Sequence, residues 1–193
     1  LFLHRDPGDV VLSSYHAMTN STRGDARLGV FYKGTVSQFI RKTYINRTPD
    51  QRASSGWEAD GGYSIDKIIE YNNKWYNVRE GYRRIGIPES FKVVTYEEMH
   101  QDPFKTIKGI LDWAEYDCGD EVIKKAIKYS EFENMWKIEH GHGKNNLEHY
   151  KGTFSRDKYK PGRVRQGKVK AYLDELSEED LEFVMEMKKR SLW

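Results

Sequence analysis

Cysteine is nearly absent from this chain, because Cys118 is the only one among its 193 residues. One thiol cannot form a disulfide within the chain, so the composition excludes a small secreted scaffold held together by disulfides. This usage favours a reducing compartment, and we predict a cytoplasmic location. Long apolar runs are absent too. No stretch reaches the roughly 18 apolar residues that a membrane-spanning helix needs, and we predict no membrane segment in the chain.

An excess of one charge is also lacking. The 32 Lys and Arg side chains nearly balance the 30 Asp and Glu side chains and leave a net charge of +2. This balance argues against a protein built wholly around a polyanion, so no nucleic-acid partner is expected. Residues 151–170 depart from it, with eight basic side chains against the single acid Asp157. Such a stretch is either a solvated loop or a cationic lid over a phosphorylated ligand.

Two common signatures of phosphate and metal sites are missing. No G-x-x-x-x-G-K-[ST] pattern occurs in the chain. His140 and His142 have neither a cysteine nor a third ligand at metal spacing, so we predict no metal site.

The N-terminal residues 1–16 predict a strand that runs directly into a helix. The apolar residues 1–3 favour a buried strand. Asp6 suits the N-cap of the helix, Pro7 its first position, and Asp9 the positive end of its dipole.

Arg5 then lies at the carboxyl edge of the strand, where ligands bind in open α/β sheets. Its guanidinium, the Ser13 hydroxyl near the helix start and the helix N–H groups together suit a dianionic phosphate. An arginine at a strand end is also a common salt-bridge partner, which is the alternative. We interpret the neighbouring His4 as a strand residue and not as a catalytic base.

The rest of the chain predicts a mostly helical α/β domain. A second strand is expected over residues 91–95, and helices are expected over 35–44, 63–85, 103–114, 120–128, 131–138 and after Ser177. Two strands separated by helices predict a parallel sheet of which this chain carries about two strands. The length suits one core, so residues 1–193 are expected to form a single, partial domain.

Apolar spacing predicts which helix faces point inward. In the helix over 63–85 the inward stripe is Ile68, Tyr71, Trp75, Val78, Tyr82 and Ile85. In the helix over 35–44 it is Val36, Phe39 and Ile40, and in the helix that Asp102 and Pro103 begin it is Phe104, Ile107, Ile110, Leu111 and Ala114. At the last helix we expect a capping box, in which the Ser177 side chain accepts from the backbone of Asp180 and the Asp180 side chain accepts from the backbone of Ser177. We also expect Leu176 to pack on Leu181.

The segment with Arg5, Pro7, Asp9 and Ser13 resembles the 3′-phosphate motif of the sulfotransferases, enzymes that use 3′-phosphoadenosine 5′-phosphosulfate (PAPS). In that family an Arg is followed by a Pro two places on, an Asp two further, and a Ser eight places after the Arg. The resemblance continues in family order along nearly the whole chain, and the pattern from Gly34 to Trp75 looks more like bacterial-type members than vertebrate cytosolic ones. Its further segments are residues 34–41, the helix around Trp75, 94–98, 130–139 and 163–169.

The resemblance implies a P-loop-NTPase-like sulfotransferase fold and PAPS as co-substrate, without a metal. It implies that Arg5 and Ser13 hold the 3′-phosphate. It also implies that Arg165, Gln166 and Gly167 close over this phosphate, with Arg163 nearby. The family usually has Arg-Lys-Gly at residues 165–167, so the clamp here has one cation fewer.

The same resemblance implies that Tyr96, Ser130 and Phe132 surround the adenine, with an aromatic face for stacking and a hydroxyl for the base edge. Each has an alternative from local structure alone. Tyr96 follows a strand and is then half-buried, Phe132 is a core anchor, and Ser130 is the cap of the next helix. A further departure from the family is Tyr172, where a Trp is common.

Two parts of the family's machinery are not found in the chain. These are the loop that binds the 5′-phosphosulfate and the histidine that acts as base, and both are expected upstream of Leu1. No catalytic residue is therefore assigned, and the chain alone is expected to be inactive.

The implied function is transfer of a sulfuryl group to a hydroxyl or amine of a small-molecule or saccharide acceptor. The alternatives are a non-catalytic nucleotide-binding fragment and a basic module for polyanions. The oligomeric state stays open.

Overall fold

Two short parallel strands, β1 (Phe2–His4) and β2 (Val93–Thr95), pair in a register that puts His4 beside Thr95. The predicted parallel pairing is thus confirmed. The computed structural model describes residues 1–19, 34–41, 64–139 and 167–193. Arg163, Arg165 and Gln166, with most of the basic stretch 151–170, lie outside the described residues.

Helices make up most of the described chain. Their bounds are α1 (Pro7–Thr19), α2 (Val36–Arg41), α4 (Ile65–Arg84), the 3₁₀ helix η1 (Pro88–Ser90), α5 (Tyr96–Gln101), α6 (Pro103–Trp113), α7 (Asp120–Ser130), α8 (Phe132–Glu139), α9 (Tyr172–Glu175) and α10 (Glu178–Lys188). Each helix and strand predicted from the sequence is present, with ends that differ by a few residues.

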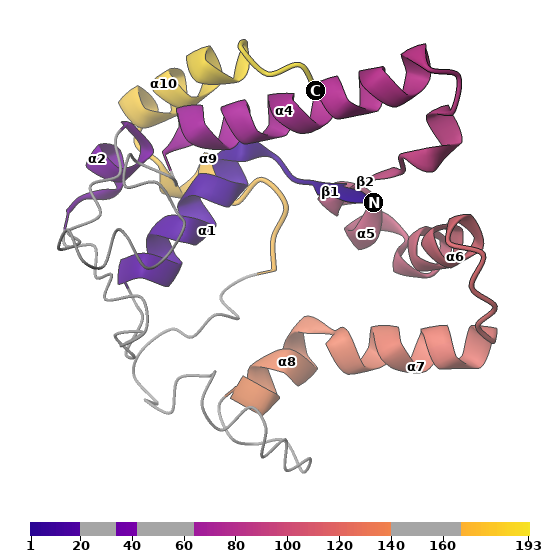
Figure 1. Cartoon of the computed structure of the whole chain (residues 1–193). Coiled ribbons are helices and arrows are strands. Elements are labelled where there is room, and N and C mark those ends of the chain that lie inside the picture. Colours follow the sequence, from indigo (N-terminus) through magenta and orange to yellow (C-terminus); the bar gives the residue numbers. More distant parts are fainter. Residues whose placement is uncertain (20–33, 42–63, 140–166) are drawn as a thin grey trace, which may run out of the picture.

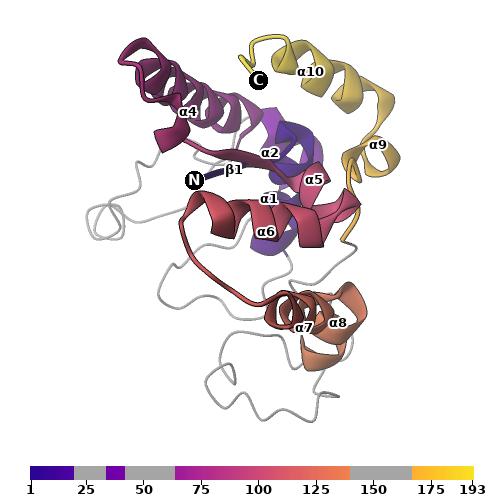
Figure 2. The same cartoon turned by 90° about the vertical axis from the view of Figure 1, so that its right-hand side faces the viewer.

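The strands lie between α4 on one side and α6 on the other (Figures 1 and 2). Helices α1, α2 and α10 pack against α4, and α9 packs against α1. Helices α7 and α8 lie beyond α6 and are set apart from this group in both views.

The helix starts follow local sequence rules. Pro7 is the first residue of α1, and the Asp6 carboxylate accepts a hydrogen bond from the Gly8 N–H at 2.8 Å. The Asp102 carboxylate likewise accepts from the Lys105 N–H at 2.9 Å. These local rules act within a few residues, so the sequence predicts them well.

The start of α10 is confirmed in part. The Ser177 hydroxyl accepts from the Asp180 N–H at 3.3 Å, as predicted. Asp180 does not reciprocate but forms an ion pair with Arg41 of α2. Burial alone raises the pKa of Asp180, but the hydrogen bonds from Arg41, Ser37 and Ser177 outweigh it and lower the pKa below its ordinary value.

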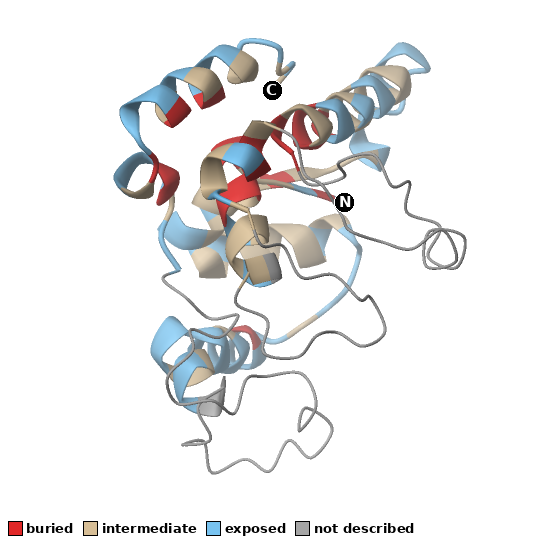
Figure 3. Cartoon of the chain, turned by 90° about the vertical axis from the view of Figure 1, so that its left-hand side faces the viewer, coloured by how far each residue is buried: buried red, intermediate tan, exposed pale blue. Residues whose placement is uncertain are grey.

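The main core lies where α1, α2, α4, α9 and α10 meet, as the concentration of buried residues in Figure 3 shows. Its buried members are Val11, Leu12, Phe39, Ile40, Ile65, Ile68, Ile69, Tyr172, Leu176 and Val184. The predicted inward residues of α2 are therefore confirmed, and Leu181 packs against the same core.

The predicted burial of β1 is only partly right. Phe2 is buried and stacks on Trp75 of α4, with ring centroids 5.6 Å apart. Leu1 and Leu3 are more than half exposed. Side chains alternate along a strand, so Leu3 points to the face of β1 opposite to that of Phe2.

The predicted inward faces of α4 and α6 are also less buried than expected. On α4 Ile68 is buried, but Tyr71 is exposed although its neighbours Ile69 and Asn72 are buried. Val78 and Ile85 are exposed because they lie beyond the part of the helix that packs on the core. On α6 no residue is buried, and Ala114, which follows it, is exposed.

Candidate functional site

Arg5 and Tyr96 occupy equivalent places, since each is the first residue after its strand. The parallel register brings the carboxyl ends of β1 and β2 to one edge of the sheet. There the Arg5 guanidinium carbon lies 4.1 Å from the centroid of the Tyr96 ring, a cation–π distance. Two residues that the sequence assigned to the phosphate and to the adenine are therefore in direct contact.

Arg5 also lies close to Asp9, in the first turn of α1. The Arg5 Nε lies 3.9 Å from the Asp9 Oδ2, which is an ion pair but too long for a hydrogen bond. This Nε is buried without a hydrogen-bond partner. Among the described residues no hydrogen bond engages the terminal nitrogens either, so the guanidinium retains donors for an anionic ligand.

Asp9 itself is fully buried and does more than favour the helix dipole. Its Oδ2 accepts a hydrogen bond from the backbone N–H of Lys170 at 2.6 Å, and its Oδ1 accepts from that of Tyr172 at 3.4 Å. The carboxylate thus connects α1 to residues 167–172, which the sequence did not indicate.

Ser13 lies in the middle of α1, six residues after Pro7. It is exposed, and no hydrogen bond joins it to Arg5 in the part of the chain that the structure describes. The expectation that it lies near the helix start is wrong, because the helix begins where predicted and already runs two turns before reaching Ser13.

Gly167 is the described member of the predicted clamp. Its φ of +60° lies in the left-handed region that favours glycine. A Cβ on Gly167 would lie 3.0 Å from the Phe132 ring. Gly167 and Phe132, which are far apart in the sequence, therefore lie close together.

Phe132 and Ser130 lie at the junction of α7 and α8. Phe132 is 42% exposed, which rules out the alternative of a core anchor. Ser130 is the last residue of α7, and its hydroxyl donates to the Ile127 carbonyl at 3.0 Å. It therefore ends α7, and the alternative that it caps the following helix is wrong. Tyr96 is partly buried, which agrees with its alternative as well as with an adenine contact.

A buried polar cluster behind Arg5 escaped the sequence analysis. The Lys188 ammonium lies 2.5 Å from the Asp6 carboxylate and 3.0 Å from the Tyr172 hydroxyl. Burial by itself lowers the pKa of Lys188, but its hydrogen bonds to Asp6 and Tyr172 outweigh this and raise the pKa. Local patterns gave no signal for the cluster, since Asp6 and Lys188 are 182 residues apart.

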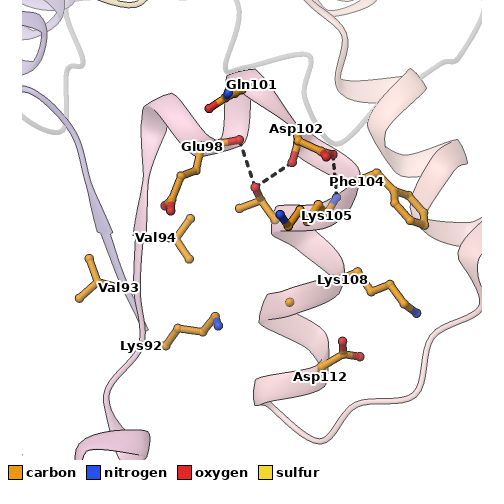
Figure 4. A pocket seen from close by; sticks show the side chains of 12 residues that line it. Lys92, Val93, Val94, Glu98, Gln101, Asp102, Phe104, Lys105, Lys108 and Asp112 are labelled. Atoms are coloured by element: carbon orange, nitrogen blue, oxygen red, sulfur yellow. Dashed lines mark hydrogen bonds between the residues drawn. The ribbon is translucent and has the colours of Figure 1, made fainter.

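A pocket of about 890 Å³ lies elsewhere, between β2, α5 and α6 (Figure 4). Its polar groups already hold helix ends together: the Thr106 hydroxyl donates to the carbonyls of Glu98 and Asp102. Its lining has both lysines and carboxylates, so it is not a site of one charge. The pocket contains neither Arg5 nor Tyr96 and is not the candidate site.

The described residues contain neither a metal-ligand cluster nor a membrane-spanning helix. Within residues 1–19, 34–41, 64–139 and 167–193, no group of His, Cys, Asp and Glu could hold a metal ion. Over the same ranges no helix has the length and apolar character to cross a membrane.

Known proteins were compared with the chain. A family model described as the sulfotransferase domain matches residues 1–192. The mouse proteins sulfotransferase 2A6 and sulfotransferase 2A2 are 26% and 24% identical to it over 137 residues, 70% of this chain and 38% of each relative. The chain thus spans well under half the length of these curated relatives.

Solved structures give the same result for the fold. A mouse sulfotransferase, SULT7A1, in complex with PAP has a TM-score of 0.59 and 14% identity, covering 97% of this chain and 56% of its own. A retinol dehydratase in complex with androsterone and the inactive cofactor PAP has a TM-score of 0.57 and 20% identity, covering 97% of this chain and 45% of its own. The predicted fold class is confirmed.

Proposed function

Because the chain belongs to the sulfotransferase domain family, as its motifs predict, we propose that the protein binds PAPS and transfers its sulfuryl group to a hydroxyl or amine. The observation that carries this proposal is the Arg5 guanidinium on the Tyr96 ring at the carboxyl edge of the parallel strands. That edge is where open α/β sheets bind ligands. PAP, which is bound in the structural neighbours, has a 3′-phosphate and an adenine to match these two side chains.

The described residues fit the non-reacting part of PAPS. The Arg5 donors that no described residue engages suit the 3′-phosphate, and the open backbone at Gly167 lets the chain approach it closely. Tyr96 and the exposed Phe132 offer aromatic faces for the adenine, with the hydroxyl of Ser130 near its edge. We assign Ser13, Arg163, Arg165 and Gln166 to the same site on the motif alone.

Bound PAPS supplies the sulfuryl group, which leaves the 5′-phosphate and bonds to the acceptor oxygen or nitrogen as the acceptor loses a proton. Residues 1–193 bind and orient the adenosine 3′-phosphate in this proposal. We assign no base and no 5′-phosphosulfate loop within them.

For the acceptor we propose a small molecule. Two neighbours are complexes with androsterone and with retinol, which supports this class over saccharides. We further propose that residues 1–193 belong to one domain. A cytoplasmic location stays a prediction from the single cysteine.

The direct test compares Arg5→Ala with Arg84→Ala, an exposed arginine at the far end of α4. Loss of a charge-assisted contact should weaken PAP binding in the natural protein by on the order of 2–4 kcal/mol. Isothermal titration would record this as a rise of roughly thirty-fold or more in Kd. Arg84→Ala should bind like the wild type.

Equal affinity of all three proteins for PAP would remove Arg5 from the site. If the protein instead binds anionic polymers with steep salt dependence and PAP does not compete, the basic stretch 151–170 is the functional surface.

A further inference from the structure

The Asp9 carboxylate is contacted from two separate parts of the chain. It belongs to the first turn of α1, its oxygens accept the backbone N–H groups of Lys170 and Tyr172, and the Arg5 Nε lies 3.9 Å away. No part of this side chain is exposed. A buried carboxylate is unfavourable unless hydrogen bonds and a countercharge compensate for the lost water, so this arrangement is a specific one.

The segment that Asp9 holds has a backbone that would not adopt its shape without support. Lys170 has a φ of +58° and Gly167 a φ of +60°. Glycine tolerates this region, whereas a lysine is strained in it. The short hydrogen bond from the Lys170 N–H to Asp9 lies at the strained residue, and the other end of the segment packs on Phe132.

We propose that Asp9 is a positioning residue, which holds residues 167–172 and the Arg5 side chain in a common geometry around the 3′-phosphate. This inference rests on the proposed function. Asp9 attracts the Nε side of Arg5 toward α1, while the Tyr96 ring lies against the guanidinium face. The terminal nitrogens are then presented at the sheet edge, beside the chain that follows Gly167.

A positioning role and a purely electrostatic role predict opposite changes in phosphate affinity when Asp9 is neutralised. A carboxylate close to the arginine that binds a phosphate repels that phosphate, so its neutralisation should tighten binding. If Asp9 acts by positioning, its neutralisation should weaken binding instead, and only for ligands that have the 3′-phosphate. The two effects can therefore be separated by experiment.

The test uses Asp9→Asn in the natural protein, with Asp174→Asn, an exposed carboxylate on α9, as the control. Calorimetry would measure the Kd of PAP and of adenosine 5′-phosphate, which lacks the 3′-phosphate. In Asp9→Asn we expect the preference for PAP to fall by about ten-fold or more, the size expected when a binding group is misplaced. The Kd of adenosine 5′-phosphate and both Kd values of Asp174→Asn should stay close to the wild type.

Equal weakening toward both nucleotides, or an unchanged or stronger preference for PAP, would overturn the proposal. A wild-type protein with no preference for PAP would instead overturn the proposed function. If Asp9→Asn does not fold, the same pair of measurements is made in a Lys170→Gly background, where glycine relieves the left-handed strain and keeps the backbone N–H. Failure to fold in that background too would assign Asp9 to stability and reject the positioning role.

Discussion

The two halves of the candidate site belong to regions that are packed very differently. Arg5 and Asp9 adjoin the core formed by α1, α2, α4, α9 and α10, where ten hydrophobic side chains are buried together. Phe132 and Ser130 belong to the α6–α8 region, where Ile123 is the only buried hydrophobic residue among those described. The same contrast is visible in Figure 3, where α6, α7 and α8 show little burial.

This difference has a consequence for ligand binding. Close packing fixes side-chain rotamers, so the phosphate half is pre-organised. The adenine half has fewer packing contacts and can adjust with little cost. Changes in the core region should therefore act on stability, and changes at α8 should act on affinity.

The largest expected effect on the free energy of unfolding comes from replacing one phenylalanine by alanine in each region. Phe39→Ala in the core should lower the free energy of unfolding by about 3–5 kcal/mol, because it leaves a cavity among fully buried neighbours. Phe132→Ala should lower it by about 1 kcal/mol or less, since that ring is 42% exposed. Urea denaturation monitored by tryptophan fluorescence would measure both. Equal losses would show that α8 is packed as tightly as the core.

A smaller effect is expected from two glycines that each face an aromatic ring. A Cβ on Gly8 would lie 2.8 Å from the Tyr172 ring in the core. The ring has no room to move there, so Gly8→Ala should cost about 1–3 kcal/mol of stability.

Gly167→Ala is the matching substitution next to the α6–α8 region, which is less densely packed than the core. Its Cβ would lie 3.0 Å from Phe132, on a backbone with a φ of +60°. We expect a modest loss of stability, on the order of 1 kcal/mol, because α8 can shift and the left-handed strain is confined to one residue. The PAP affinity should fall by about ten-fold. Denaturation and calorimetry on both variants would test this, and a loss confined to stability at Gly167 would separate it from the nucleotide.

The local parts of this architecture could be predicted from the sequence. The order from β1 through Asp6 and Pro7 to α1 follows from capping and proline rules that act within a few residues. The parallel pairing follows from strands that are separated by helices, and it is enough to bring Arg5 to Tyr96.

The parts that were missed depend on distant contacts. Asp9 meets Lys170 across 161 residues, and no helical or strand period records such a pairing. The exposure of Leu3 was missed because apolar residues in a short strand do not show which face has a covering helix. The approach of Gly167 to Phe132 is another contact between distant residues that no period in the sequence records.

The smallest expected effect concerns His4, which lies in β1 between the two regions. Its Nε2 is buried without a hydrogen-bond partner, and its ring stacks on Trp193 with centroids 5.2 Å apart. Burial lowers the pKa of His4, although the charges of Glu97 and Asp6 partly oppose this. A histidine whose pKa is lowered by folding binds a proton more readily in the unfolded state than in the folded state. Its contribution to stability is therefore present above its ordinary pKa, and it is lost as the pH falls through the pKa of the folded state. Stability should therefore decline slightly between about pH 8 and pH 5.

In His4→Phe, which keeps an aromatic ring against Trp193, this part of the decline should disappear, whereas the exposed His100→Gln should keep it. Urea midpoints measured across this range would decide, and parallel pH profiles for the wild type and His4→Phe would show that the strand tolerates a charged His4 without cost.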